Sequence, residues 1–260
     1  MSDSLYAEII SEGHDVLLLH GWGMHGGVWG EFKQQLSEKN KIHTIDLPGY
    51  GFSKDMQSDF SFESLTKVIE NYINTNINKD VTLVAWSLSG LLALNLLKRQ
   101  NTKIRNIVFI ASTPCFTQKE DWQHGLEQTV FDGFAGELEQ DYKKTLQRFL
   151  SLQTRGSEIA KQDLRELKNK LNERGEPNIE ALKQGLNILS QQDLRINKIY
   201  SVPALVLLGD NDTLVPVAVK TEFEKMFSNI EIEILEKVGH APFITQAVKC
   251  SEKIKNFINE

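Results

Sequence analysis

The most informative stretch of this chain is Val81-Thr82-Leu83-Val84-Ala85-Trp86-Ser87-Leu88-Ser89-Gly90. Its first six residues form an apolar, β-prone run that predicts a buried strand, and the residues from Leu88 to Arg99 predict a helix. Ser87 therefore lies at a strand-to-helix junction. A tight turn there would expose the serine hydroxyl at the carboxyl edge of a sheet, as a nucleophile requires.

The positions two before and two after Ser87 must be small, because backbone and side chains crowd at such a turn. Glycine is usual at both, whereas this chain has Ala85 and Ser89, followed by Gly90. The strict Gly-x-Ser-x-Gly pattern fails, but the steric requirement is still met. The alternative interpretation of Ser87 is an ordinary helix N-cap.

A serine hydroxyl needs a base to become a nucleophile, and the base needs an acid to orient it. In this type of fold the chain order is nucleophile, acid, histidine, which leaves His124 and His240. His240 follows the last predicted strand, whereas His124 lies in an inserted region. Asp210 and Asp212 both follow the preceding strand; Asp212 is the preferred acid, although spacing separates the two only weakly.

The negative charge that develops during acyl transfer needs backbone donors. The Leu88 N–H, directly after Ser87, is one candidate. The Trp22 N–H is the second, because the sequence His20-Gly21-Trp22-Gly23 follows a predicted strand and its glycines allow a sharp turn. A plain glycine turn is the alternative.

Strands and helices alternate on either side of this stretch, which predicts one α/β domain with a mostly parallel central sheet flanked by helices. Between about 114 and 200 the pattern is helical only, so we expect a helical lid inserted before the strand that carries the acid. Strands are expected over 15–20, 41–47, 81–86, 105–111, 203–209 and 231–235, and helices over 60–74, 88–99, 217–227 and 245–258.

Composition excludes several classes. The 260 residues carry a net charge of −6, which gives no reason to expect nucleic acid as a partner. No apolar stretch is long enough to span a membrane, and Met1-Ser2-Asp3-Ser4 lacks the basic start of a signal peptide. Cys115 and Cys250 fit a reducing compartment. We expect a cytoplasmic monomer with no metal and no cofactor, since no metal-ligand cluster or dinucleotide fingerprint is present.

One part of the lid has the opposite charge to the rest of the chain. Residues 143–174 include nine basic and four acidic side chains, so they carry +5 and the remainder carries −11. A basic face can attract an acidic partner, although it can also be an ordinary solvated surface.

Together, the segments around Trp22, Ser87 and His240 resemble the α/β-hydrolase family. More narrowly, Ser112-Thr113-Pro114-Cys115-Phe116 and Arg148-Phe149-Leu150-Ser151-Leu152-Gln153-Thr154 resemble the pimeloyl-[acyl-carrier protein] methyl ester esterases of biotin synthesis, and the similarity extends over nearly the whole chain.

The resemblance implies a role for each matching residue. Ser87, Asp212 and His240 match the catalytic triad, and Trp22 and Leu88 match oxyanion and substrate contacts. The lid positions that match substrate contacts are Phe149, Leu150, Ser151, Leu152 and Gln153. The basic lid positions that match a docking surface for acidic acyl carrier protein are Lys144, Arg148, Lys161 and Arg165.

Three functions are compatible with these sequence features. The leading one is hydrolysis of the methyl ester of a carrier-bound dicarboxylate. A second is a general carboxylesterase or C–C bond hydrolase that acts on a free small molecule, and a third is a hydrolase fold that only binds. The full set of triad residues disfavours the third, and the basic lid favours the first over the second.

Overall fold

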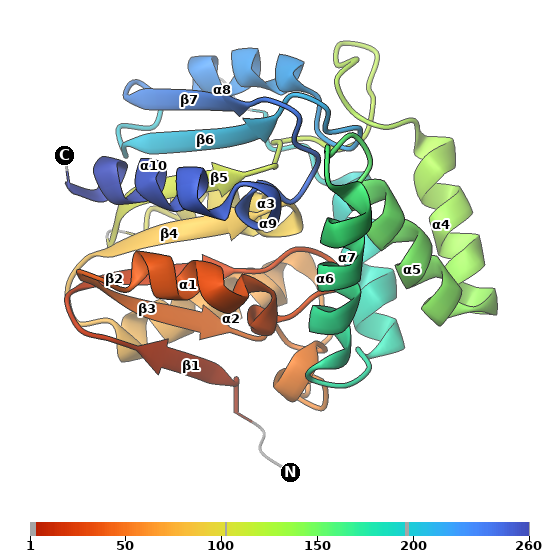
Figure 1. The fold of residues 1–260 in the computed structure, drawn as a ribbon, viewed down its shortest axis with the longest axis horizontal. Coiled ribbons are helices and arrows are strands. Elements are labelled where there is room, and N and C mark those ends of the chain that lie inside the picture. The colour runs from red at the N-terminus through yellow and green to blue at the C-terminus, as the bar shows by residue number, and fades with distance from the viewer. Residues whose placement is uncertain (1–3, 102, 196–197, 260) are drawn as a thin grey trace.

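The computed structural model describes residues 4–101, 103–195 and 198–259. Within this part of the chain lies a sheet of seven strands in the order β1-β3-β2-β4-β5-β6-β7 (Figure 1). β1 is antiparallel to β3, and the other neighbouring pairs are parallel, which confirms the predicted mostly parallel sheet. The strands are β1 (Ala7–Ile10), β2 (His14–Leu19), β3 (Asn40–Ile45), β4 (Val81–Trp86), β5 (Ile104–Ile110), β6 (Ala204–Gly209) and β7 (Ile230–Leu235).

Helices cover both faces of the sheet, because successive strand side chains point in opposite directions. Leu17 packs in a cluster with α2, α3 and α8, whereas Val16 packs on the other face with α1 and α10. These helices are α1 (Gly30–Leu36), α2 (Phe62–Asn76), α3 (Leu88–Lys98), α8 (Lys220–Met226) and α10 (Ala247–Asn259). In the described residues, no helix is long and apolar enough to cross a membrane.

The lid contains the helices between β5 and β6. Figure 1 shows them beyond the arrowheads of the parallel strands, at the carboxyl edge of the sheet. They are α4 (Gln128–Gln140), α5 (Tyr142–Gln153), α6 (Ala160–Asn172) and α7 (Ile179–Gln191). The lid therefore covers the edge at which the loops after the strands emerge.

The sequence pattern does not predict two short elements. β1 has four residues and lies at the edge of the sheet, so it has little periodicity, and α1 begins at Gly30 and has seven residues. Two predicted helices are also divided. A 3-10 turn over Val217–Val219 precedes α8, and the short helix α9 (Pro242–Thr245) precedes α10.

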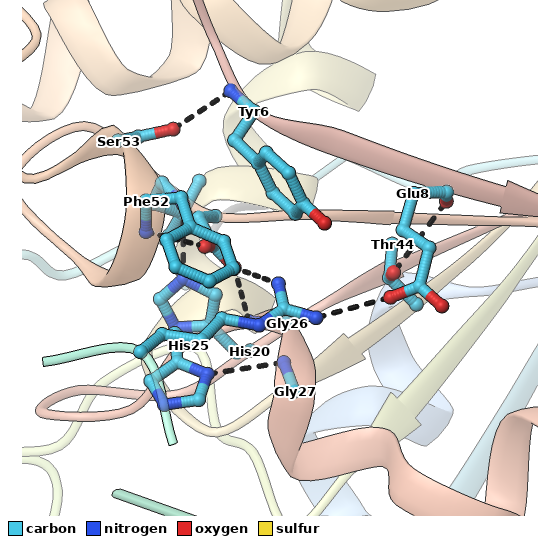
Figure 2. A network of polar contacts seen from close by, with 12 residues as sticks. Tyr6, Glu8, His20, His25, Gly26, Gly27, Thr44, Phe52 and Ser53 are labelled. Carbon is cyan, nitrogen blue, oxygen red and sulfur yellow. Dashed lines mark hydrogen bonds and ion pairs between the residues drawn. The ribbon is translucent and has the colours of Figure 1, made fainter. Parts of the chain in front are cut away.

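A buried ion-pair network fastens the lid to the sheet. Arg174, which follows α6, donates to Asp46 at 2.8 Å and to Glu8 at 3.0 Å, and its guanidinium lies 5.0 Å from the ring centre of Tyr6. Burial raises the pKa of Glu8, but hydrogen bonds and charge interactions with Lys33 and Arg174 outweigh it and lower that pKa. Figure 2 shows Tyr6, Glu8, Phe52 and Gly26 converging on this network.

Candidate active site

Ser87 occupies a sharp turn between β4 and α3. Its backbone has φ 55° and ψ −120°, a conformation that non-glycine residues rarely adopt. The turn is held from both sides, because the Ser87 N–H donates to Ile110 O at 3.0 Å and the Ser112 hydroxyl donates to Ser87 O at 2.8 Å. Ser87 occupies the N-cap position of α3, but its side chain makes no capping hydrogen bond within the described residues.

The turn accommodates Ala85 and Ser89 where glycine is usual. Both side chains are fully buried. The glycine that the geometry requires is Gly90, because a Cβ there would lie 1.8 Å from Ser112 Oγ. A side chain is therefore sterically excluded at position 90, one residue beyond Ser89.

His240 lies in the loop after β7, with its ring between Ser87 and Asp212. Its Nε2 is 2.8 Å from Ser87 Oγ, and its Nδ1 is 2.7 Å from Asp212 Oδ2. The His240 N–H donates to Gln153 O at 2.9 Å, and the indole N–H of Trp86 donates to His240 O at 2.8 Å. Both ring nitrogens of His240, and its backbone N–H and carbonyl groups, therefore have hydrogen-bond partners.

The two aspartates after β6 have different partners. The second oxygen of Asp212, Oδ1, accepts from the N–H groups of Leu214 and Val215 at 2.8 and 3.1 Å. Asp210 instead accepts from the Val238 N–H at 3.2 Å, on the loop that precedes His240. Asp212 is thus the aspartate that contacts the histidine, whereas Asp210 ties the two loops together. A proton on Nδ1 directed at the Asp212 carboxylate leaves Nε2 free to accept from the serine.

Two backbone N–H groups, one directly after Ser87 and one in the loop after β2, have no acceptor in the part of the chain that the structure describes. Among the described residues, neither Leu88 N nor Trp22 N donates a hydrogen bond. Both residues are fully buried. Since nearly all buried N–H groups in proteins are paired, such donors beside a serine hydroxyl are suited to receiving an anionic oxygen.

The Trp22 side chain connects this loop to the lid. Its indole N–H donates to Leu182 O in α7 at 2.8 Å, and its ring packs edge-on against Phe149 of α5 at 4.7 Å. A Cβ at Gly23, which has φ 75°, would lie 2.8 Å from Leu146 in α5. The lid helices therefore pack directly on the loop after β2.

The five consecutive lid residues from Phe149 to Gln153 do not share one environment, because an α-helix turns through about 100° per residue. Phe149 and Leu150 are buried, Leu152 is half-buried, and Ser151 is exposed and donates to Gln147 O at 2.9 Å. Gln153 is fully buried, and neither its Nε2 nor its Oε1 has a hydrogen-bond partner in the described chain.

The basic lid positions lie on the outer surface of α5 and α6, which pack against each other. All four side chains are exposed, namely those of Lys144, Arg148, Lys161 and Arg165. Arg148 forms an ion pair with Glu137 and lies 4.7 Å from the ring centre of Phe134. The other three form no ion pair with any residue that the structure describes. The same part of the chain contains no cluster of three or more metal-ligating side chains.

Comparison with known proteins identifies the family. Residues 16–247 match the family described as alpha/beta hydrolase fold. The chain belongs to the α/β-hydrolase family. As a solved structure of this fold, an esterase from Exiguobacterium antarcticum superimposes with a TM-score of 0.88 at 22% identity, covering 98% of this chain and 96% of that one.

Sequence relatives within the hydrolase family are similar along the whole chain. A protein from Nitrosospira multiformis is 34% identical, covering 98% of each chain, and one from Aeromonas salmonicida is 36% identical, covering 98% of this chain and 99% of the relative. Both are named pimeloyl-[acyl-carrier protein] methyl ester esterase. These relatives are esterases, which supports a hydrolase activity for this α/β-hydrolase.

Proposed function

We propose that this protein is a serine esterase in which Ser87 is the nucleophile, His240 the base and Asp212 the orienting acid. One observation carries the proposal, namely the continuous hydrogen-bonded chain Ser87–His240–Asp212, with distances of 2.8 and 2.7 Å. The turn at Ser87 supports it, because Ser87 has a positive φ angle that is rare for a residue other than glycine. Strained backbone conformations of this kind cluster at active sites, where the surrounding structure maintains them.

The reaction follows from these positions. Ser87 Oγ attacks the ester carbonyl while His240 Nε2 takes its proton, and the same nitrogen returns the proton to the leaving methanol. A water molecule, activated by His240, then hydrolyses the acyl-serine and releases the acid. During both steps the oxyanion lies against the N–H groups of Leu88 and Trp22.

The substrate that we propose is the methyl ester of pimeloyl-[acyl-carrier protein], in the cytoplasmic synthesis of biotin. Relatives that are 33–36% identical over almost the full chain carry that activity in their names. The lid offers the apolar side chains of Phe149 and Leu152 to an acyl chain. It offers a polar group the amide of Gln153, which has no hydrogen-bond partner among the described residues.

The carrier protein would dock on the exposed basic positions of α5 and α6. Lys144 and Arg148 are one helical turn apart on α5, and Lys161 and Arg165 are one turn apart on α6, so each pair shares a face. Acyl carrier proteins are acidic, and exposed lysine and arginine side chains increase the rate of encounter with such a partner.

A comparison of two substrates tests the proposal. Carrier-bound methyl pimelate and free dimethyl pimelate are offered to the wild-type protein, to Ser87→Ala and to Ser228→Ala, a control at an exposed serine. We expect the wild-type protein and Ser228→Ala to prefer the carrier-bound ester, and Ser87→Ala to lose about 10⁴-fold or more in kcat on both. Equal use of both esters would contradict the carrier-bound substrate, and a folded, active Ser87→Ala would contradict the mechanism.

A further inference from the structure

Ser89, the serine at a position where glycine is usual, makes one hydrogen bond that links two parts of the site. Its hydroxyl donates to the backbone carbonyl of His20, in the loop after β2. Ser89 and His20 are both fully buried, and among the described residues no other donor reaches the His20 carbonyl. The first turn of the helix that follows the nucleophile is thereby tied to the loop that carries Trp22.

The His20 ring forms the next link in the same direction. The Leu47 N–H donates to His20 Nε2 at 3.0 Å, so this nitrogen carries no proton. The ring proton is therefore on Nδ1, which donates to the Gly21 carbonyl at 2.9 Å. Burial lowers the pKa of His20 to about 4, which keeps the ring neutral, with this proton arrangement, at neutral pH.

The bond to the Gly21 carbonyl fixes the direction of the Trp22 N–H. The two groups belong to the same peptide unit, and a trans peptide points its C=O and N–H in opposite directions. The Met24 N–H also donates to Gly21 O, at 3.3 Å. Because the preceding peptide, His20–Gly21, is held by Ser89, both peptide planes ahead of the Trp22 N–H are fixed.

The loop has little room in which to move. A Cβ at Gly21 would lie 3.2 Å from Ser87 Cβ and 3.1 Å from the Trp86 ring, so the Gly21 backbone lies against the nucleophile turn itself. An error of a few tenths of an ångström in this loop would change the distance between the Trp22 N–H and an oxygen bound at Ser87. Donors of this kind act only when they are already aimed at the developing charge.

We infer that Ser89 is a positioning residue for ester hydrolysis, whose hydroxyl, through the His20–Gly21 backbone, aims the Trp22 N–H at the oxyanion. The inference rests on the proposed function, since it assigns Ser89 to the same site. It also explains what a serine at position 89 can do that the usual glycine cannot, because glycine has no hydroxyl to donate to the His20 carbonyl.

The experiment compares Ser89→Ala and Ser89→Gly with the wild-type protein on a small p-nitrophenyl ester. We expect kcat to fall roughly tenfold in both variants, less than the 10² to 10³ for complete loss of an oxyanion donor, and KM to change less than about twofold. A trifluoromethyl ketone, which forms an anionic adduct with Ser87, should inhibit both variants about tenfold more weakly. Circular dichroism and thermal unfolding establish that each variant is folded.

Thr117→Val is the matched control. The Thr117 hydroxyl is buried and donates to the Ser190 carbonyl at 2.8 Å, so its removal also leaves a buried carbonyl unpaired, but outside the site. We expect reduced thermal stability in this variant, with kcat and inhibition unchanged. Folded Ser89 variants that retain wild-type kcat and inhibition would overturn the inference alone. A wild-type protein without esterase activity, or an active Ser87→Ala, would overturn the proposed function as well.

Discussion

The carboxyl edge of the sheet and the lid hold their polar side chains in opposite ways. Ser87, Asp212 and His240 are at most 6% exposed, and each is fixed by hydrogen bonds that involve backbone groups. The four basic positions on α5 and α6 are exposed, and only Arg148 among them has an ion-pair partner in the described chain. One region is buried and held by hydrogen bonds, and the other is exposed to solvent.

This difference separates chemistry from recognition. Proton transfer and oxyanion binding need groups that are held in place before the reaction, because reorganisation would add to the barrier. An encounter surface for a charged partner works through long, solvated side chains, whose individual contributions are small and screened by salt. Substitutions in the two regions should therefore differ both in size and in the substrate that they affect.

The largest effect is expected at the sheet edge. Asp212→Asn should lower kcat by about 10³- to 10⁴-fold on carrier-bound and free esters alike, because the His240 ring loses the acceptor that fixes its proton on Nδ1. Asp210→Asn is the matched control, two residues away on the same loop, and should lower kcat by less than about tenfold. Steady-state kinetics on both esters measure this, and the reverse order of the two losses would refute the placement of Asp212.

Arg174 is an exception among the basic side chains of the lid, because it is buried and paired as the residues at the sheet edge are. Its side chain is 9% exposed and forms an ion pair with Asp46, whose side chain is fully buried. Arg174→Met should lower the free energy of unfolding by about 3 kcal/mol, because it leaves the Asp46 carboxylate buried without its partner. In urea unfolding, the exposed Arg165→Met should change stability by less than about 0.5 kcal/mol. Equal stability of the two variants would show that Arg174 does not fasten the lid.

The buried ring of His20 predicts a loss of stability in mild acid. Burial lowers its pKa from 6.5 to about 4, so the unfolded chain binds more protons than the folded one between these values, and stability falls as the pH falls through this window. Its contribution should be about 2 kcal/mol between pH 7 and pH 5. Urea unfolding of wild-type and His20→Gln proteins at both pH values measures it; an unchanged pH dependence in the variant would assign the loss to other groups.

The smallest effect is expected on the lid surface. Lys161→Glu with Arg165→Glu should lower kcat/KM for the carrier-bound ester roughly tenfold, and added salt should have a similar effect on the wild-type protein. The free ester should be cleaved at an unchanged rate. Lys67→Glu with Lys79→Glu, an equal charge change at exposed positions outside the lid, is the control. Matching losses in both double variants would mean that net charge, not this surface, attracts the carrier.

The sequence alone was sufficient for the elements that have local patterns. Alternating apolar strands and helices placed Ser87 and His240 after strands, and parallel strands bring such loops to one edge of a sheet. Six of the seven strands in the described chain were expected within a residue or two of their observed bounds. The four-residue β1 has no such pattern, because a short edge strand is set by its partner β3 and not by its own periodicity.

Contacts between distant residues were decided only by the tertiary structure. Spacing in the sequence favours Asp212 over Asp210 only weakly, and the packing of the loop after β6 against the loop before His240 is what clearly separates them. The pairing of Arg174 with Asp46, 128 residues away, and the bond from Ser89 to the His20 carbonyl leave no local signal either. Periodicity records which side of an element is buried, whereas hydrogen bonds depend on directions that are fixed only when separate elements pack together.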